Sequence, residues 1–171
     1  MSTPSAKIIS MKDTDLSRDT YAVVAARRTQ FDQLVWQVPV LSLTAQAFLF
    51  SIALSGDATR TARAIASVLS LLMTILSLHL MAKHRQAEVA DSHWLESYES
   101  QFKPPAGGLP WPMHGPTWSR YRNSVDPKIG LLGVLSRFGG FQVWSWGLAI
   151  FGVAAVVVLL LTIIRPHILS S

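Results

Sequence analysis

Three long runs of apolar residues divide this chain, and polar segments separate them. The first run (Trp36 to Ser55) and the third (Val143 to Ile164) contain no charged residue, and the second (residues 62–82) contains only Arg63 and His79. About 20 helical residues of this kind are enough to cross the hydrocarbon core of a bilayer. The pattern therefore predicts an all-α membrane protein with three transmembrane helices.

Composition supports the membrane interpretation. Half of the 171 residues are hydrophobic and 15% are charged, whereas soluble domains have about a quarter of their residues charged. The first 35 residues are too polar to form a cleavable signal peptide, whose apolar segment comes early. The chain has no cysteine, which excludes a disulfide framework and fits soluble parts that face a reducing compartment.

The lysines and arginines predict the orientation of the spans. Twelve of the fifteen lie in the N-terminal segment or between the second and third spans: Lys7, Lys12, Arg18, Arg27, Arg28, Lys83, Arg85, Lys103, Arg120, Arg122, Lys128 and Arg137. Arg60, Arg63 and Arg165 fall on the opposite side. Because basic residues are retained in the cytoplasm, we expect a bacterial inner-membrane protein with its N-terminus cytoplasmic and its C-terminus outside.

Tryptophan residues agree with this topology. Trp36, Trp144 and Trp146 lie at the span ends that the topology places at the cytoplasmic interface, where indole rings are favoured. The net charge of +5 then fits attraction to anionic lipid. Acidic residues are interspersed with the basic ones and no recognition motif accompanies them, so nucleic acid is not an expected partner.

The second span continues into a polar segment without a break. Residues 61–102 contain no proline or glycine, and about forty helical residues measure about 60 Å, twice the hydrocarbon thickness. An apolar stripe at helical spacing follows the span, and a matching stripe precedes the first span. With the short GDATR turn, residues 18–102 predict an antiparallel helical hairpin whose cytoplasmic part is packed by Tyr21, Val24, Phe31, Trp94, Tyr98 and Phe102.

A metal or catalytic site was considered in the same segment. His84, Glu88 and Asp91 share one helix face, but no H-E-x-x-H element and no second cluster accompany them. A charged i, i+4 pair of His84 with Glu88 on a solvated face is the simpler interpretation. No nucleophile motif, phosphate loop or catalytic carboxylate pair occurs, so we expect no enzyme, no metal and no cofactor.

Polar residues inside the spans are the candidate functional residues. Gln46 lies at the middle of the first span and requires a partner such as Ser70 or Thr74, because an unpaired amide is costly in hydrocarbon. The second span has small residues every four positions, which permit close helix packing. Two interpretations stay open: bonds within one chain, or a pore or subunit contact made by Gln46, Ser70, Thr74, Ser77 and His79.

The remaining segments are assigned by composition. Residues 1–17 are expected to be a disordered tail, and residues 103–127, rich in proline and glycine, a cytoplasmic loop. Residues 128–141 resemble a short interfacial helix, and residues 165–171 form the outer tail.

The segments ARRTQFDQLVWQ before the first span and AKHRQAEVADSHW after the second place the spans between two cytoplasmic helices. In this layout residues 18–102 resemble the bacterial SLATT-type effector domains. The resemblance implies a homo-oligomeric pore or membrane effector in a defence or signalling system. The alternative is a non-conducting scaffold or accessory subunit that presents its cytoplasmic hairpin to a protein partner.

Overall fold

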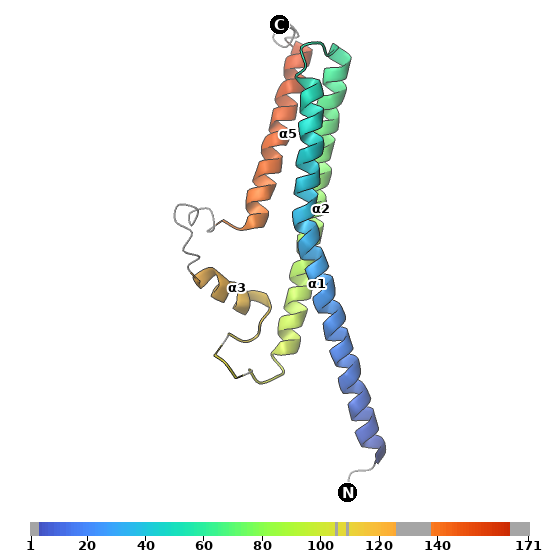
Figure 1. Ribbon diagram of the computed structural model, residues 1–171, viewed down its shortest axis with the longest axis vertical. Coiled ribbons are helices and arrows are strands. Elements are labelled where there is room, and N and C mark those ends of the chain that lie inside the picture. Colours follow the sequence, from blue (N-terminus) through green and yellow to red (C-terminus); the bar gives the residue numbers. More distant parts are fainter. Residues whose placement is uncertain (1–3, 105, 109, 126–137, 165–171) are drawn as a thin grey trace. The chain divides into compact units, whose positions relative to one another are not determined.

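A computed structural model describes residues 4–104, 106–108, 110–125 and 138–164. Its helices are α1 (Pro4–Ala53), α2 (Arg60–Glu99), α3 (Gly115–Ser124) and α5 (Gly140–Ile164), as Figure 1 shows. The described part of the chain has no strand. Three of the helices, α1, α2 and α5, are long and apolar enough to cross a membrane. The prediction of an all-α fold with three helices able to span a membrane is therefore confirmed for the described residues.

Two expected segments differ from the structure. α1 begins at Pro4, so the tail expected to be disordered is helical from that residue; proline is favoured at the first helical position, and no proline or glycine follows before Pro39. The loop 103–127 contains α3, which has a proline in its first turn. The expected interfacial helix (128–141) lies mostly, and the outer tail (165–171) wholly, outside the described residues.

The chain forms two compact units, to which α1 and α2 both contribute. Unit 1 contains residues 1–32 and 85–128, and unit 2 contains residues 33–84 and 129–171. Unit 2 holds most of each apolar run, and unit 1 holds α3 and the charged parts of α1 and α2.

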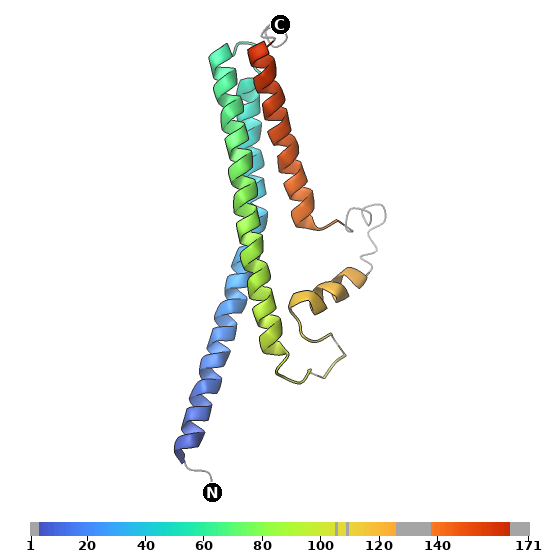
Figure 2. The same cartoon turned by 180° about the vertical axis from the view of Figure 1, so that it is seen from behind.

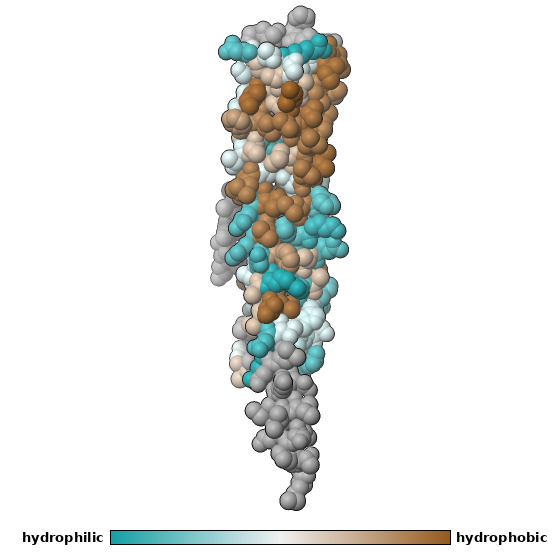
Figure 3. Space-filling view, turned by 90° about the vertical axis from the view of Figure 1, so that its right-hand side faces the viewer, coloured by the Kyte–Doolittle hydropathy of each residue, from teal (hydrophilic) through white to brown (hydrophobic). Residues whose placement is uncertain are grey.

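Unit 2 is a three-helix arrangement in which α5 lies beside α1 and α2 (Figures 1 and 2). Ala53, Ala66 and Val158, one from each helix, form a buried cluster. Close approach depends on small residues, since a Cβ at Gly152 of α5 would lie 2.8 Å from Cγ2 of Thr74. Hydrophobic side chains cover much of the surface along the spans (Figure 3), as expected for a lipid-facing surface.

Two arginines in the first turn of α2 cap the ends of the other two spans. Arg60 donates from Nε to the carbonyl oxygen of Thr162 (3.1 Å) and from Nη2 to that of Ile163 (2.9 Å), at the carboxyl end of α5. Arg63, only 4% exposed, donates to the carbonyl oxygens of Ser55 (2.8 Å) and Gly56 (3.3 Å), just after α1. A cation at a helix carboxyl end satisfies free carbonyls and favours the helix dipole.

Unit 1 pairs the first part of α1 with the last part of α2. Tyr21 contacts Glu99 whereas Arg28, seven residues later, contacts Glu88, so the paired segments are antiparallel. Among the residues of this unit whose burial is described, the buried hydrophobic side chains are Val24 of α1 and Leu95 of α2, at 8% and 0% exposure. α3 packs on α2 through the polar contacts described below.

Candidate functional site

A closed chain of hydrogen bonds joins α1 and α2 inside unit 2. Ser70 Oγ donates to Gln46 Oε1 at 2.7 Å, and Gln46 Nε2 donates to Thr74 Oγ1 at 2.7 Å. Thr74 Oγ1 in turn donates to the carbonyl oxygen of Ser70 at 3.1 Å. All three side chains are at most 4% exposed. The Gln46 amide, which the sequence places in hydrocarbon, therefore has both a donor (Ser70) and an acceptor (Thr74) within its own chain.

The other candidate polar residues of the span do not join this cluster. Ser77 is buried at 6% exposure, whereas His79 is exposed on α2. The hydroxyls of Ser42 and Ser67 are also buried, and neither has a hydrogen-bond partner among the described residues. The five residues proposed from the sequence thus divide into a buried set of four and a separate exposed histidine.

The tryptophans expected as interface anchors all lie in unit 2. Trp146 is the most exposed at 73%, Trp36 is 41% exposed, and Trp144 is partly buried. A Cβ at Gly140 would collide with the end of the Trp36 ring, so the glycine allows the start of α5 to approach α1.

Buried acids of α2 pair with arginines in unit 1. Arg27 binds Asp91 through two bonds, Nε to Oδ2 at 2.8 Å and Nη2 to Oδ1 at 2.5 Å. Glu88 receives Arg28 at Oε1 (3.1 Å) and Arg85 at Oε2. Glu88 and Asp91 are only 4% and 6% exposed. The expected solvated face at Glu88 is therefore wrong: the acid is buried between two guanidinium groups.

The same ion pairs occupy the carboxylates of Glu88 and Asp91, which share a helix face with His84. Among the described residues no group of three His, Cys, Asp or Glu side chains could hold a metal ion. The oxygens of Glu88 and Asp91 accept charge-assisted bonds, which are stronger than neutral ones. Their role is to join α1 to α2.

The expected aromatic packing of the hairpin is only partly buried. The Tyr21 and Tyr98 rings lie 5.2 Å apart, which links α1 to α2. Tyr98 also contacts Trp94 (5.6 Å) and Phe102 (5.2 Å), but these two rings are 40% and 53% exposed. Leu95, which periodicity did not single out, occupies the fully buried position.

Three side chains on one face of α2 hold the segment before and within α3. Glu99 Oε2 accepts from the Met113 amide (2.7 Å) and the His114 amide (3.2 Å), and Glu99 Oε1 lies 2.6 Å from His114 Nδ1. One turn earlier, Glu96 Oε1 accepts from Thr117 Oγ1 at 2.9 Å. Ser92 Oγ accepts from the Gly115 amide at 2.9 Å. The spacing 92, 96, 99 is one helical face.

Gly115 and Tyr21 complete this contact. Gly115 has φ +72°, and a Cβ there would collide with Glu96, so only glycine fits. Tyr21 Oη donates to Glu99 Oε1 at 2.8 Å. Partial burial, together with the bond to Glu99 and the negative charge of that carboxylate, raises the pKa of Tyr21 to about 12.

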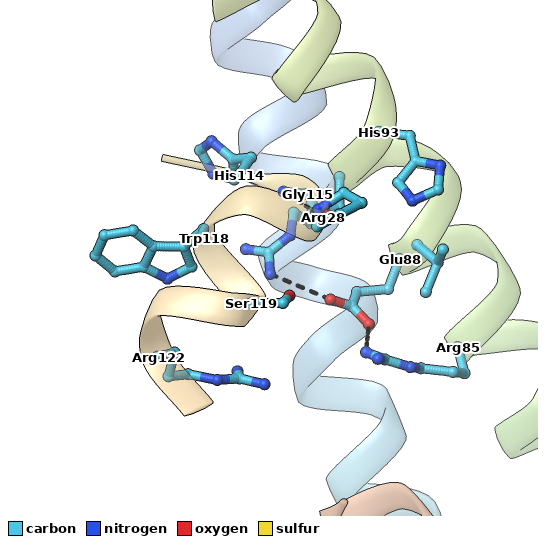
Figure 4. A pocket seen from close by; sticks show the side chains of 12 residues that line it. Arg28, Arg85, Glu88, His93, His114, Gly115, Trp118, Ser119 and Arg122 are labelled. Atoms are coloured by element: carbon cyan, nitrogen blue, oxygen red, sulfur yellow. Dashed lines mark hydrogen bonds and ion pairs between the residues drawn. The ribbon is translucent and has the colours of Figure 1, made fainter. Parts of the chain in front are cut away.

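A basic pocket of about 190 Å³ opens between the elements of unit 1. Figure 4 shows Arg28 from α1, Arg85 and Glu88 from α2, and Arg122 from α3 around it. His93, His114, Trp118 and Ser119 also line it. Sequence reasoning missed this pocket because α3 was not expected. The signal that could have found α3 is the Gly115-Pro116 pair followed by ten residues without proline or glycine.

No protein-family model, curated protein or solved structure matches this chain. The described residues define the class: an all-helical protein with three helices long and apolar enough to span a membrane. Within unit 1 it carries a charged, α3-containing module with a basic pocket.

Proposed function

We propose that this protein is a non-conducting, three-span membrane protein that presents unit 1 to a protein partner in the cytoplasm. The observation that carries the proposal is the closed hydrogen-bond chain of Gln46, Ser70 and Thr74. A conducting path needs polar groups free to replace the hydration shell of an ion. The polar groups of Gln46, Ser70 and Thr74 already form hydrogen bonds with one another.

The position of the remaining candidates supports the same proposal. Ser77 is buried, whereas His79 is exposed on α2. A row that lines a pore requires its members to face one axis. A protein that packs its helices through paired polar groups requires only that each group be satisfied.

Unit 1 is suited to presentation because charged pairs fix its helices together. The bidentate Arg27–Asp91 pair and the Arg28–Glu88–Arg85 triad hold α1 on α2, and Trp94 and Phe102 stay accessible. Exposed aromatic residues are enriched at protein interfaces. The lysine and arginine distribution supports placing unit 1 in the cytoplasm of a bacterium, with the C-terminus outside.

The rival proposal is a homo-oligomeric pore or membrane effector of a bacterial defence or signalling system. Its support is the resemblance of residues 18–102 to SLATT-type effector domains, which rests on helix layout. α5 adds a third candidate span to that layout.

Ion flux separates the two proposals. The protein is reconstituted in liposomes, and release of a trapped dye and of potassium is measured across pH, with native mass spectrometry of the same sample. We expect no flux, and we expect Ser70→Leu to lower the thermal stability of the protomer because it breaks the buried chain. Flux in the unmodified protein that Ser70→Leu abolishes, with stability and oligomer size unchanged, contradicts the proposal.

Labelling tests the orientation, because the chain has no cysteine of its own. Gly56→Cys should react with a membrane-impermeant maleimide in intact cells, and Ser97→Cys should react only after lysis. The opposite pattern reverses the topology and removes unit 1 from the cytoplasm.

A further inference from the structure

We propose that the basic pocket of unit 1 binds a phosphoryl group. The first argument is charge. Three guanidinium groups line the pocket, from Arg28, Arg85 and Arg122, against a single carboxylate, that of Glu88. The arginines and the glutamate alone give the lining a net charge of about +2, which favours an anion over a metal ion or a neutral ligand.

The second argument is that the lining has unused donors. Glu88 engages Arg28 and Arg85, one at each oxygen, so the single carboxylate of the lining is already paired with two guanidinium groups. The Nε of Arg28 is buried and has no hydrogen-bond partner. Arg122 has no carboxylate partner among the described residues, and its guanidinium extends from α3 on the side where Arg28 and Ser119 lie (Figure 4). A tetrahedral anion supplies the acceptors that these donors lack.

Neutral donors complete the lining. The hydroxyls of Ser92 and Ser119 and the ring of His93 line the same pocket. Ser92 accepts a bond from the Gly115 amide, so its own hydrogen is free to point at an anion. Trp118 adds one aromatic wall. Arginine forks and hydroxyls in one cavity are the donor types that recognise phosphate oxygens.

The amino end of α3 is not what attracts the anion. The Gly115 amide already donates to Ser92 Oγ, and the Thr117 amide donates to Glu96 Oε1 at 3.4 Å. The guanidinium groups are therefore the binding groups, and α3 contributes through Arg122.

Size limits the ligand. The volume is about 190 Å³, whereas sites for drug-sized molecules measure about 300–1,000 Å³. The pocket has room for a phosphoryl group and a small part of what carries it. That group has two sources, a soluble phosphomonoester or inorganic phosphate, and the headgroup of an anionic lipid.

Calorimetry on the full chain tests the site. Inorganic phosphate is titrated into protein held in nanodiscs of neutral phosphatidylcholine, in chloride-free buffer. We expect one saturable site per chain. Arg122→Gln should weaken it about tenfold or more, because a charge-assisted contact is lost. Arg120→Gln is the matched control: Arg120 is exposed on the same helix but does not line the pocket, so the affinity should stay unchanged.

A second titration identifies the source. It uses nanodiscs in which a third of the lipid is phosphatidic acid. Unchanged phosphate affinity supports a soluble ligand, and an affinity lost in these discs but not in neutral ones supports the lipid headgroup. Absence of saturable binding in neutral discs, or equal weakening by the Arg122 and Arg120 variants, overturns the proposal. Neither result depends on whether the spans conduct ions. The phosphate-binding proposal can therefore be refuted without refuting the proposed function, and the reverse also holds.

Discussion

The close approach of α5 to α2 at Thr74 depends on Gly152. Two substitutions by alanine on α5, Gly152→Ala and Gly147→Ala, test this dependence. A Cβ at Gly152 would lie 2.8 Å from Thr74 Cγ2, whereas a Cβ at Gly147, on the same helix, would meet nothing within 4 Å. Both changes to alanine give the same gain in helix propensity, up to about 1 kcal/mol. Only Gly152→Ala introduces overpacking, which costs about 1–3 kcal/mol.

The difference between the two variants therefore isolates packing. We expect Gly152→Ala to be less stable than Gly147→Ala by about 1–3 kcal/mol. The measurement is reversible unfolding in mixed micelles with increasing dodecyl sulfate, followed by far-ultraviolet circular dichroism.

A second substitution should rescue the first. Thr74→Ser removes Cγ2 and keeps the hydroxyl that Gln46 bonds at 2.7 Å, and the next atoms of residue 74 lie 3.4 Å from the new Cβ. The double variant should regain most of the loss, whereas Thr74→Ser alone should lose only a methyl contact. Equal stability of Gly152→Ala and Gly147→Ala, or no rescue, means that α5 does not pack on α2 at this position.

Three further predictions follow from the polar contacts. Gln46→Leu should destabilise unit 2 by about 1–3 kcal/mol, because two intramembrane hydrogen bonds are lost; a rise in stability in the same unfolding assay contradicts this. Glu99→Gln should speed amide hydrogen exchange at Met113 about thirtyfold, since a bond to a charged acceptor is worth about 2 kcal/mol; unchanged exchange shows that the carboxylate does not hold that segment. Because the pKa of Tyr21 rises from 10.0 to about 12, the neutral phenol stabilises the fold below pH 10, and that stability is lost as pH rises from 10 to 12. In a phenolate absorbance titration, Tyr21→Phe should remove the step near pH 12; loss of a step near pH 10 instead contradicts the assignment.

The spans were predictable because a bilayer imposes composition and length directly on the sequence. The partner of Gln46 was also predictable, since Ser70 and Thr74 were the hydroxyls available on an adjacent helix. Periodicity identifies which residues share one face of a helix. That information was enough to pair Gln46 with Ser70 and Thr74.

The charged contacts of unit 1 were not predictable in the same way. The spacing of His84 and Glu88 along the sequence predicts a solvated i, i+4 pair. Only the register of α1 against α2 shows that Arg28 covers Glu88. The basic pocket needs a further element, because Arg122 reaches it only when α3 forms and docks on Ser92, Glu96 and Glu99. Register and docking are properties of pairs of segments, which a pattern along one segment does not contain.

The arginine caps of unit 2 bear on the order in which the protein assembles. Arg63 bonds residues seven and eight positions away, so that cap forms as soon as the first two spans meet. Arg60 bonds carbonyls 102 and 103 positions away, which the ribosome adds about a hundred residues later. Loop closure over such a distance is slow and costly in entropy. We therefore expect α1 and α2 to form a stable pair before α5 is inserted, with Arg60 already in place to bind the carboxyl end of α5.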